Sequence, residues 1–204
     1  MGIEPQQFEA MRRRVAGERL RRRPAPVLPG AAGGGGRVHR VILGVDPSLR
    51  GTGYGLVRVE RTGMKALGHG TIRCPSSWMR SRCLAKIAEE IRAVVGRHGP
   101  TVCAIEGLFY AQNLQTALLM GEARGACLAA VAEAGLEVFE LAPRRVKQAV
   151  VGYGAAQKDA VARMIQRLLD LEVLPEPDAA DALALAVAYA QECRAGVLSP
   201  LKAI

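Results

Sequence analysis

The stretch VILGVDPSLRGTGYGLV, residues 41–57, decides the expectation about the fold. Apolar residues and one glycine lead to a single acid, Asp46, and apolar residues resume after a segment with three glycines. Short apolar runs bounded by glycine and proline are typical of buried strands joined by a turn. The stretch therefore predicts two antiparallel strands with a carboxylate at the end of the first. Because an isolated buried charge is costly, that carboxylate needs a chemical reason.

The rest of the chain adds one more meander strand and then alternates helices with strands. The pattern predicts strands and helices over the following ranges: strands 41–46, 53–60, 65–73, 102–106 and 136–141, and helices 81–95, 112–134, 143–150, 157–171 and 178–193. We expect Ser81 to cap the first helix. This order predicts an α/β fold, in which a five-stranded mixed sheet has a three-stranded antiparallel meander, then parallel strands, and helices on both faces.

Charge and composition divide the chain into three parts. Residues 1–40 carry nine arginines and three glutamates, so most of the net charge of +9 lies there. We expect residues 1–40 to be a basic, Pro/Gly-rich flexible extension, 41–194 the folded domain and 195–204 a short tail. The extension has two interpretations. It is a segment without a fixed structure, or even the product of a start codon assigned too far upstream. Alternatively, it is a tail that adds nonspecific affinity for phosphates.

Composition also argues against several protein classes. The longest apolar run, residues 182–190, is far too short to span a membrane, and no signal-peptide core is present. We therefore expect a cytoplasmic protein with no membrane partner. The five cysteines show neither zinc-site nor disulfide spacing, so we expect free thiols.

Carboxylates stand at the ends of two predicted strands and at the start of the last predicted helix. The first and fourth strands end in an acid and can be parallel neighbours, and two further acids lie three apart on one face of the last helix. Each has a structural alternative, as a helix N-cap, a partner of the helix dipole, a turn residue or a rim charge. Together they would repel one another unless a cation neutralised them, and hard oxygen ligands suit Mg²⁺ or Mn²⁺. The pattern predicts a metal-dependent nuclease built on Asp46, Glu106, Asp178 and Asp181.

Five stretches carry a resemblance to a known family: LGVDPSLRGTGYG, AIEGLFYAQN, GEARGA, VKQAVVGYG and DAADALALA. In this order they resemble the ribonuclease H-like fold and, more narrowly, the RuvC family of crossover junction endodeoxyribonucleases, over residues 41 to about 192. The resemblance implies a homodimer that binds four-way Holliday junction DNA in recombination and DNA repair. It implies symmetric nicks in two strands of like polarity, which leave ligatable ends. Mg²⁺ is the implied cofactor, with one or two ions per subunit and Mn²⁺ as a substitute, and a RuvA–RuvB branch-migration complex is an implied partner.

The resemblance also assigns roles to individual residues. It implies that the four acids hold the metal ions, although relatives can place a histidine at the position of Asp178. Lys147 and Lys158 match lysines that support the chemistry or contact the DNA backbone, because a lysine near the scissile phosphate offsets charge in the transition state. Without the resemblance, both lysines would be read as parts of solvated helix faces.

The segment after Glu106 is the implied DNA-contacting segment. Phe109 matches an aromatic residue that can stack on an unpaired base, with Tyr110 as a second candidate, and its alternative is a core phenylalanine. Gln112 and Asn113 complete the DNA-binding set, and Gln112 stands where the family often has a basic residue, so a phosphate contact would be weakened.

Two further features concern backbone packing. Ser48 stands where the family usually has glycine, which would cause strain if that position needs a positive φ. Small residues recur every four positions along the predicted helix 112–134, at Ala117, Gly121, Gly125 and Ala129. Such a ridge lets another element approach closely, and it could pack on this chain's own sheet or on the partner's copy of the helix.

Three other functions are compatible with parts of the pattern. The glycine-rich stretch resembles the phosphate loop of actin-like ATPases and sugar kinases, but those proteins need a second such domain. A junction-binding protein without catalysis would be expected to have lost its acids, and all four are present. A different ribonuclease H-like nuclease would act on RNA hybrids or flaps, and only the resemblance argues against it.

Overall fold

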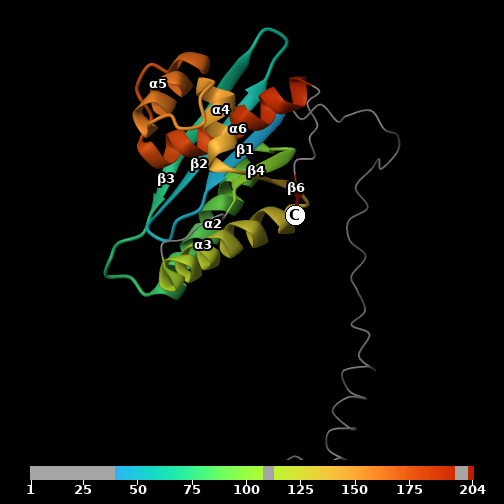
Figure 1. Cartoon of the computed structure of the whole chain (residues 1–204). Coiled ribbons are helices and arrows are strands. Elements are labelled where there is room, and N and C mark those ends of the chain that lie inside the picture. Colours follow the sequence, from blue (N-terminus) through green and yellow to red (C-terminus); the bar gives the residue numbers. More distant parts are fainter. Residues whose placement is uncertain (1–39, 108–112, 196–201) are drawn as a thin grey trace, which may run out of the picture. The chain divides into compact units, whose positions relative to one another are not determined.

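The computed structural model describes residues 40–107, 113–195 and 202–204. Its mixed sheet has the strand order β3-β2-β1-β4-β5-β6 (Figure 1). Strand β1 pairs antiparallel with β2 and parallel with β4, β2 pairs antiparallel with β3, and β4 pairs parallel with β5. These five strands confirm the predicted sheet, and their bounds are Val41–Asp46 (β1), Gly51–Val59 (β2), Met64–Arg73 (β3), Val102–Glu106 (β4) and Glu137–Leu141 (β5).

A sixth, very short strand lies in the segment expected to be a tail. Strand β6 (Lys202–Ala203) pairs antiparallel with β5, and the N–H of Ile204 donates to the carbonyl of Val138 at 3.1 Å. Two residues carry no period that sequence patterns can detect, so this pairing was not predicted.

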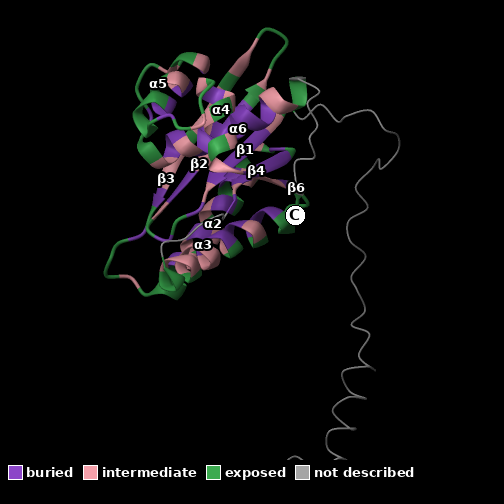
Figure 2. Ribbon diagram, viewed as in Figure 1, coloured by how far each residue is buried: buried purple, intermediate pink, exposed green. Residues whose placement is uncertain are grey.

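Helices cover both faces of the sheet, as predicted (Figures 1 and 2). One core cluster joins α2 and α3 to the sheet, and a second joins α4, α5 and α6 to the other face. Strand β1 contributes to both, with Ile42 on the α6 side and Leu43 and Val45 on the α2 side. The helix bounds are Arg80–His98 (α2), Leu114–Glu133 (α3), Pro143–Val151 (α4), Lys158–Leu168 (α5) and Pro177–Ala195 (α6).

Several predicted helix ends differ from the structure, among them the end of α2, which extends three residues further, to His98. Helix α2 begins before Ser81: its N-cap is Met79, whose carbonyl accepts from the Cys83 N–H, and no side chain caps it. Helix α5 ends at Leu168, three residues earlier than expected, because Asp170 adopts a left-handed conformation at φ 50°. The apolar period continues through the buried Leu169, so the periodicity could not reveal where the backbone leaves the helix.

The glycines after Asp46 belong to a strand, and β2 begins at Gly51 rather than at residue 53 as predicted. A Cβ atom at Gly53 would overlap the backbone carbonyl of Asp178, and one at Gly44 would overlap that of Ala182. These glycines therefore let the backbone of α6 lie directly against β1 and β2. The close approach fixes the start of α6, with its two acids, at the end of the sheet where Asp46 lies.

The turn between β1 and β2 is not strained at Ser48. Among the described residues, Asp170 is the only non-glycine residue with a positive φ. Ser48 instead exchanges two hydrogen bonds with Thr52: its N–H donates to Oγ1 at 3.2 Å, and its carbonyl accepts from that hydroxyl at 2.6 Å. The expected strain at this departure from the family pattern is therefore absent.

All five cysteines are free thiols, and no helix in the described ranges is long and apolar enough to cross a membrane.

Candidate active site

The parallel pairing of β1 with β4 brings Asp46 and Glu106 together. Val45 lies opposite Ile105 in the register, so the next residue of each strand stands at the same edge of the sheet. The two carboxyl groups are hydrogen-bonded to each other. The carboxyl ends of parallel strands are where α/β proteins commonly place their sites, because the loops that follow them open a crevice there.

Burial and mutual repulsion keep this pair from ionising fully. Burial, then Glu106 and Asp181, raise the pKa of Asp46 from 3.8 to about 8. Burial and the charge of Asp181 also raise the pKa of Glu106, while its hydrogen bond from Asp46 and the lysines Lys158 and Lys147 oppose the rise. At neutral pH the pair therefore retains a proton. A cation at this position could replace that proton.

Asp181 lies within electrostatic range of the pair and is itself bound by a lysine. Lys158 Nζ is 2.8 Å from Asp181 Oδ2, and this contact raises the pKa of Lys158. Helix α5 supplies Lys158 and α6 supplies Asp181, so the packing of these two helices brings both residues to the site. The structure thus places the predicted Lys158 beside an acid of the site, and Lys147 close enough to influence Glu106.

Asp178 occupies a neighbouring position over β2. A Cβ atom at Gly51 would lie 2.7 Å from its Oδ2 atom, so this carboxylate lies directly over the start of the strand. Its alternative role as the N-cap of α6 is wrong, since α6 begins at Pro177 and the carbonyl of Glu176 accepts the first helical hydrogen bond, from Ala180, at 2.8 Å.

The four acids gather at one edge but do not yet converge on one point. Within the described ranges, no group of three or more Asp, Glu, His or Cys side chains is arranged to hold a single metal ion. Asp46 and Glu106 contact each other, Asp181 contacts Lys158, and Asp178 lies over Gly51. The Asp46–Glu106 pair nevertheless fits a hard divalent cation, because it offers two partly buried carboxylates that repel each other without one.

The predicted DNA-contacting segment is only partly described. Phe109, Tyr110 and Gln112 lie outside the described residues. Asn113 is the N-cap of α3, where its Oδ1 atom accepts from the Thr116 N–H at 2.8 Å. The cap orients the amide and gives Asn113 a structural role that sequence reasoning did not assign to it.

Arg124 is a positioning residue that sequence reasoning missed. This arginine on α3 is only 8% exposed. Its Nη1 donates to the backbone carbonyl of Glu106, and its Nη2 lies 2.5 Å from Glu140 Oε2. It thereby ties the end of β4 to α3 and β5 and fixes where Glu106 stands. The available signal was a lone arginine among small residues in GEARGA, a pattern unusual for a buried helix face.

A meander followed by parallel strands, with acids at the ends of β1 and β4 and at the start of α6, defines a ribonuclease H-like nuclease. The family model described as crossover junction endodeoxyribonuclease RuvC matches residues 42–189. The chain therefore belongs to the RuvC family of crossover junction endodeoxyribonucleases.

Individual relatives agree with this assignment. A crossover junction endodeoxyribonuclease RuvC of Heliobacterium modesticaldum is 45% identical over 158 residues, which cover 77% of this chain and 98% of the relative. One from Acinetobacter baylyi is 45% identical over 150 residues, covering 74% of this chain and 82% of the relative. The solved structure of T. thermophilus RuvC in complex with Holliday junction substrate aligns with a TM-score of 0.75 and 32% identity, covering 81% of this chain and all of that one.

The raised pKa of Asp46 predicts how pH changes the stability of the metal-free protein. Between 3.8 and about 8 the folded state holds more protons than the unfolded state, so the free energy of unfolding falls as pH rises. Each pKa unit corresponds to about 1.4 kcal/mol. Urea unfolding in EDTA would be measured at pH 5 and pH 8 for Asp46→Asn and the wild type. The free energy of unfolding of Asp46→Asn, relative to that of the wild type, should be higher at pH 8 than at pH 5. An equal difference between the two proteins at both pH values would contradict the prediction.

Proposed function

We propose that this enzyme cleaves Holliday junctions at a divalent-metal site formed by Asp46, Glu106, Asp178 and Asp181. The observation that carries the proposal is the partly buried, hydrogen-bonded Asp46–Glu106 pair, which cannot ionise fully unless a cation neutralises it. Family membership supplies the reaction, junction resolution by phosphodiester hydrolysis in recombination and DNA repair. The T. thermophilus relative in complex with Holliday junction substrate supports four-way junction DNA as the substrate.

The proposed cofactor is Mg²⁺, one or two ions per subunit, with Mn²⁺ as a substitute. Held by these carboxylates, such ions would supply an activated water and would stabilise the leaving oxygen of a phosphodiester. For Asp181 to join the pair as a ligand through Oδ2, it must release Lys158. The freed Nζ of Lys158 could then donate to a phosphate oxygen, and Lys147, whose charge already reaches Glu106, adds positive potential at the same edge.

The proposed assembly is a homodimer that packs through the ridge on α3. The inner side of α3, with Cys127 and Val131, is buried against its own sheet, which leaves the ridge for another partner. Cβ atoms at Gly121 and Gly125 would meet nothing within 4 Å, and Leu118 beside them is 57% exposed. A second copy of α3 is the occupant that suits the reaction, because two symmetric cuts need two sites related by a two-fold axis.

The dimer surface makes a direct prediction for Gly125→Leu. A large side chain at this exposed glycine should leave the monomer folded and prevent close helix packing, so sedimentation should show a monomer. Gly96→Leu is the matched control, since Gly96 is also an exposed helical glycine with nothing within 4 Å. A Gly125→Leu protein that stays dimeric would exclude the ridge as the interface.

The remaining elements of the proposal rest on the family resemblance. Phe109 and Tyr110 would stack on junction bases, while Gln112 and Asn113 would contact the DNA backbone. Residues 1–40 would form an extension outside the nuclease domain, and residues 195–204 a short C-terminal segment. The enzyme would act in the cytoplasm, where its DNA substrate lies, and the RuvA–RuvB branch-migration complex is its proposed partner.

Substrate competition tests the proposed function. The full chain would be incubated in Mg²⁺ with a labelled four-way junction, a linear duplex of the same sequence and an RNA–DNA hybrid. We expect cleavage of the junction alone. Cleavage of the hybrid in preference to the junction would keep the fold and contradict the substrate, and tight junction binding without cleavage in Mg²⁺ or Mn²⁺ would contradict catalysis.

A further inference from the structure

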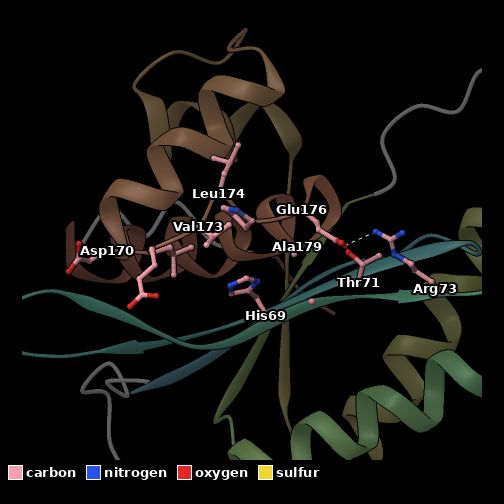
Figure 3. A pocket seen from close by; sticks show the side chains of 12 residues that line it. His69, Thr71, Arg73, Asp170, Val173, Leu174, Glu176 and Ala179 are labelled. Carbon is pink, nitrogen blue, oxygen red and sulfur yellow. Dashed lines mark hydrogen bonds and ion pairs between the residues drawn. The ribbon is translucent and has the colours of Figure 1, made fainter.

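Arg73 and Glu176 form an exposed ion pair at the edge of the active site. Arg73 is the last residue of β3, and its Nη2 atom lies 2.8 Å from Glu176 Oε2 (Figure 3). Their side chains are 70% and 56% exposed. Exposed pairs of this kind contribute about 0–1 kcal/mol to stability, so the fold does not depend on this one. Stability therefore does not explain why the two side chains are paired, and we look for a role in function.

The position of Arg73 relative to the acids gives that explanation. Arg73 lies opposite Gly51 in the β2–β3 register, and the carboxylate of Asp178 lies over Gly51. The charge of Asp178 also contributes to the raised pKa of Arg73, after the larger contribution of Glu176. Strand β3 is two strands from β1. Asp46 lies opposite Gly53, which lies opposite Thr71, so Arg73 stands two strands across and two residues along from Asp46. At a strand spacing of about 4.8 Å and a rise of about 3.4 Å per residue, the end of β3 lies roughly 12 Å from Asp46, within the length of a few nucleotides.

Glu176 holds the guanidinium in a position that suits a phosphate. A carboxylate and a phosphate oxygen both bind an arginine fork by charge-assisted hydrogen bonds, so either anion can occupy the same place. Glu176 stands between Pro175 and Pro177, whose rings restrict the backbone on both sides. The acid therefore keeps the long, flexible Arg73 side chain aimed beside the active site while no DNA is bound.

The surroundings restrict where DNA could reach this arginine. The pair closes one end of an open groove of about 700 Å³ between β3 and residues 170–176. Two further acids, Asp170 and Glu172, line the groove beyond Glu176 and would repel a phosphate chain. A DNA strand can thus meet Arg73 from the active-site end, and the groove gives the Glu176 side chain space into which it can move.

We propose that Arg73 is a substrate-positioning residue, which exchanges Glu176 for a backbone phosphate of the junction strand a few nucleotides from the scissile bond. The inference rests on the proposed function, since it requires that a junction strand crosses the edge of the sheet at Asp46. It assigns Glu176 a role as a competitor that the phosphate displaces.

Junction affinity as a function of salt tests this role. Binding of a labelled four-way junction would be measured in EDTA, where cleavage is prevented, for the wild type, Arg73→Ala, Arg73→Lys and Glu176→Gln. We expect Arg73→Ala to bind about tenfold more weakly, with a salt slope reduced by about one. Arg73→Lys should recover most of the slope, and Glu176→Gln should bind more tightly than the wild type because the competing anion is gone.

The control is another exposed arginine–glutamate pair. Arg92 Nε lies 2.6 Å from Glu133 Oε2, the two side chains are 49% and 58% exposed, and the pair links α2 to α3. Arg92→Ala should leave affinity and salt slope unchanged. If Arg73→Ala behaves like Arg92→Ala while the wild type binds and cleaves junctions, the inference is wrong and the proposed function stands. A wild type that neither binds nor cleaves junctions would instead overturn the proposed function, and the inference with it.

Discussion

Asp46→Asn is expected to reduce the rate of junction cleavage in Mg²⁺ by at least about a thousandfold, because a metal ligand and its charge are lost at the reacting centre. The protein should remain folded, since asparagine keeps the shape of the side chain and cannot ionise in this partly buried position. The measurement is the single-turnover cleavage rate of a labelled junction at saturating protein.

Asp159→Asn is the matched control for this experiment. Asp159 is an exposed acid next to Lys158 in the first turn of α5, so its loss changes local charge without altering the Asp46–Glu106 pair. Its cleavage rate should stay within a few-fold of the wild type. If Asp46→Asn kept more than a tenth of the wild-type rate, Asp46 could not be a ligand of the catalytic metal.

Gly44→Ala is expected to destabilise the fold by about 3 kcal/mol or more, since a backbone clash is harder to relieve than crowded side chains. The added Cβ would overlap the Ala182 carbonyl and lie 3.0 Å from the Ala186 nitrogen, both backbone atoms of α6. The helix would have to move off the sheet and take Asp181 with it. Thermal unfolding should show a midpoint lowered by roughly 10 °C, and cleavage should fall as well.

Gly96→Ala separates this clash from the general effect of alanine. Gly96 lies inside α2, has nothing within 4 Å of its Cβ position and lacks a positive φ. Alanine there should stabilise the protein by about 0.5–1 kcal/mol. A Gly44→Ala protein as stable as the wild type would show that α6 does not depend on close contact with β1.

The pairing of the first two acids could be predicted because it follows from strand order. Asp46 and Glu106 each end an apolar run, and a mixed sheet with a meander first makes β1 and β4 parallel neighbours. The alternation of apolar residues and the turn residues between them predict where each strand begins and ends from short stretches of sequence. The same local signals located the helices to within a few residues.

Features that depend on contacts between distant segments could not be predicted in this way. Only Gly51 was expected to lie in the turn before β2, and the role of the β2 glycines appears only once the backbone of Asp178 lies over Gly53. The pairing of Arg73 with Glu176 joins residues 103 positions apart. Arg124 stands out in the sequence as a lone arginine among small residues, but its partner, the carbonyl of Glu106, is known only from the packing of α3 against β4. The spacing of apolar residues along the sequence does not predict such contacts, because each depends on how whole helices and strands pack against one another.

Mapping the cuts in a synthetic four-way junction, with each strand labelled in turn, tests the central claim most directly. The full chain would be mixed with the junction in EDTA, and Mg²⁺ would then be added. The proposed metal site and dimer predict no cleavage before Mg²⁺, and afterwards paired nicks at symmetric positions in two strands of like polarity, which a ligase can seal. Cleavage that proceeds in EDTA, or single unpaired cuts in Mg²⁺, would contradict it.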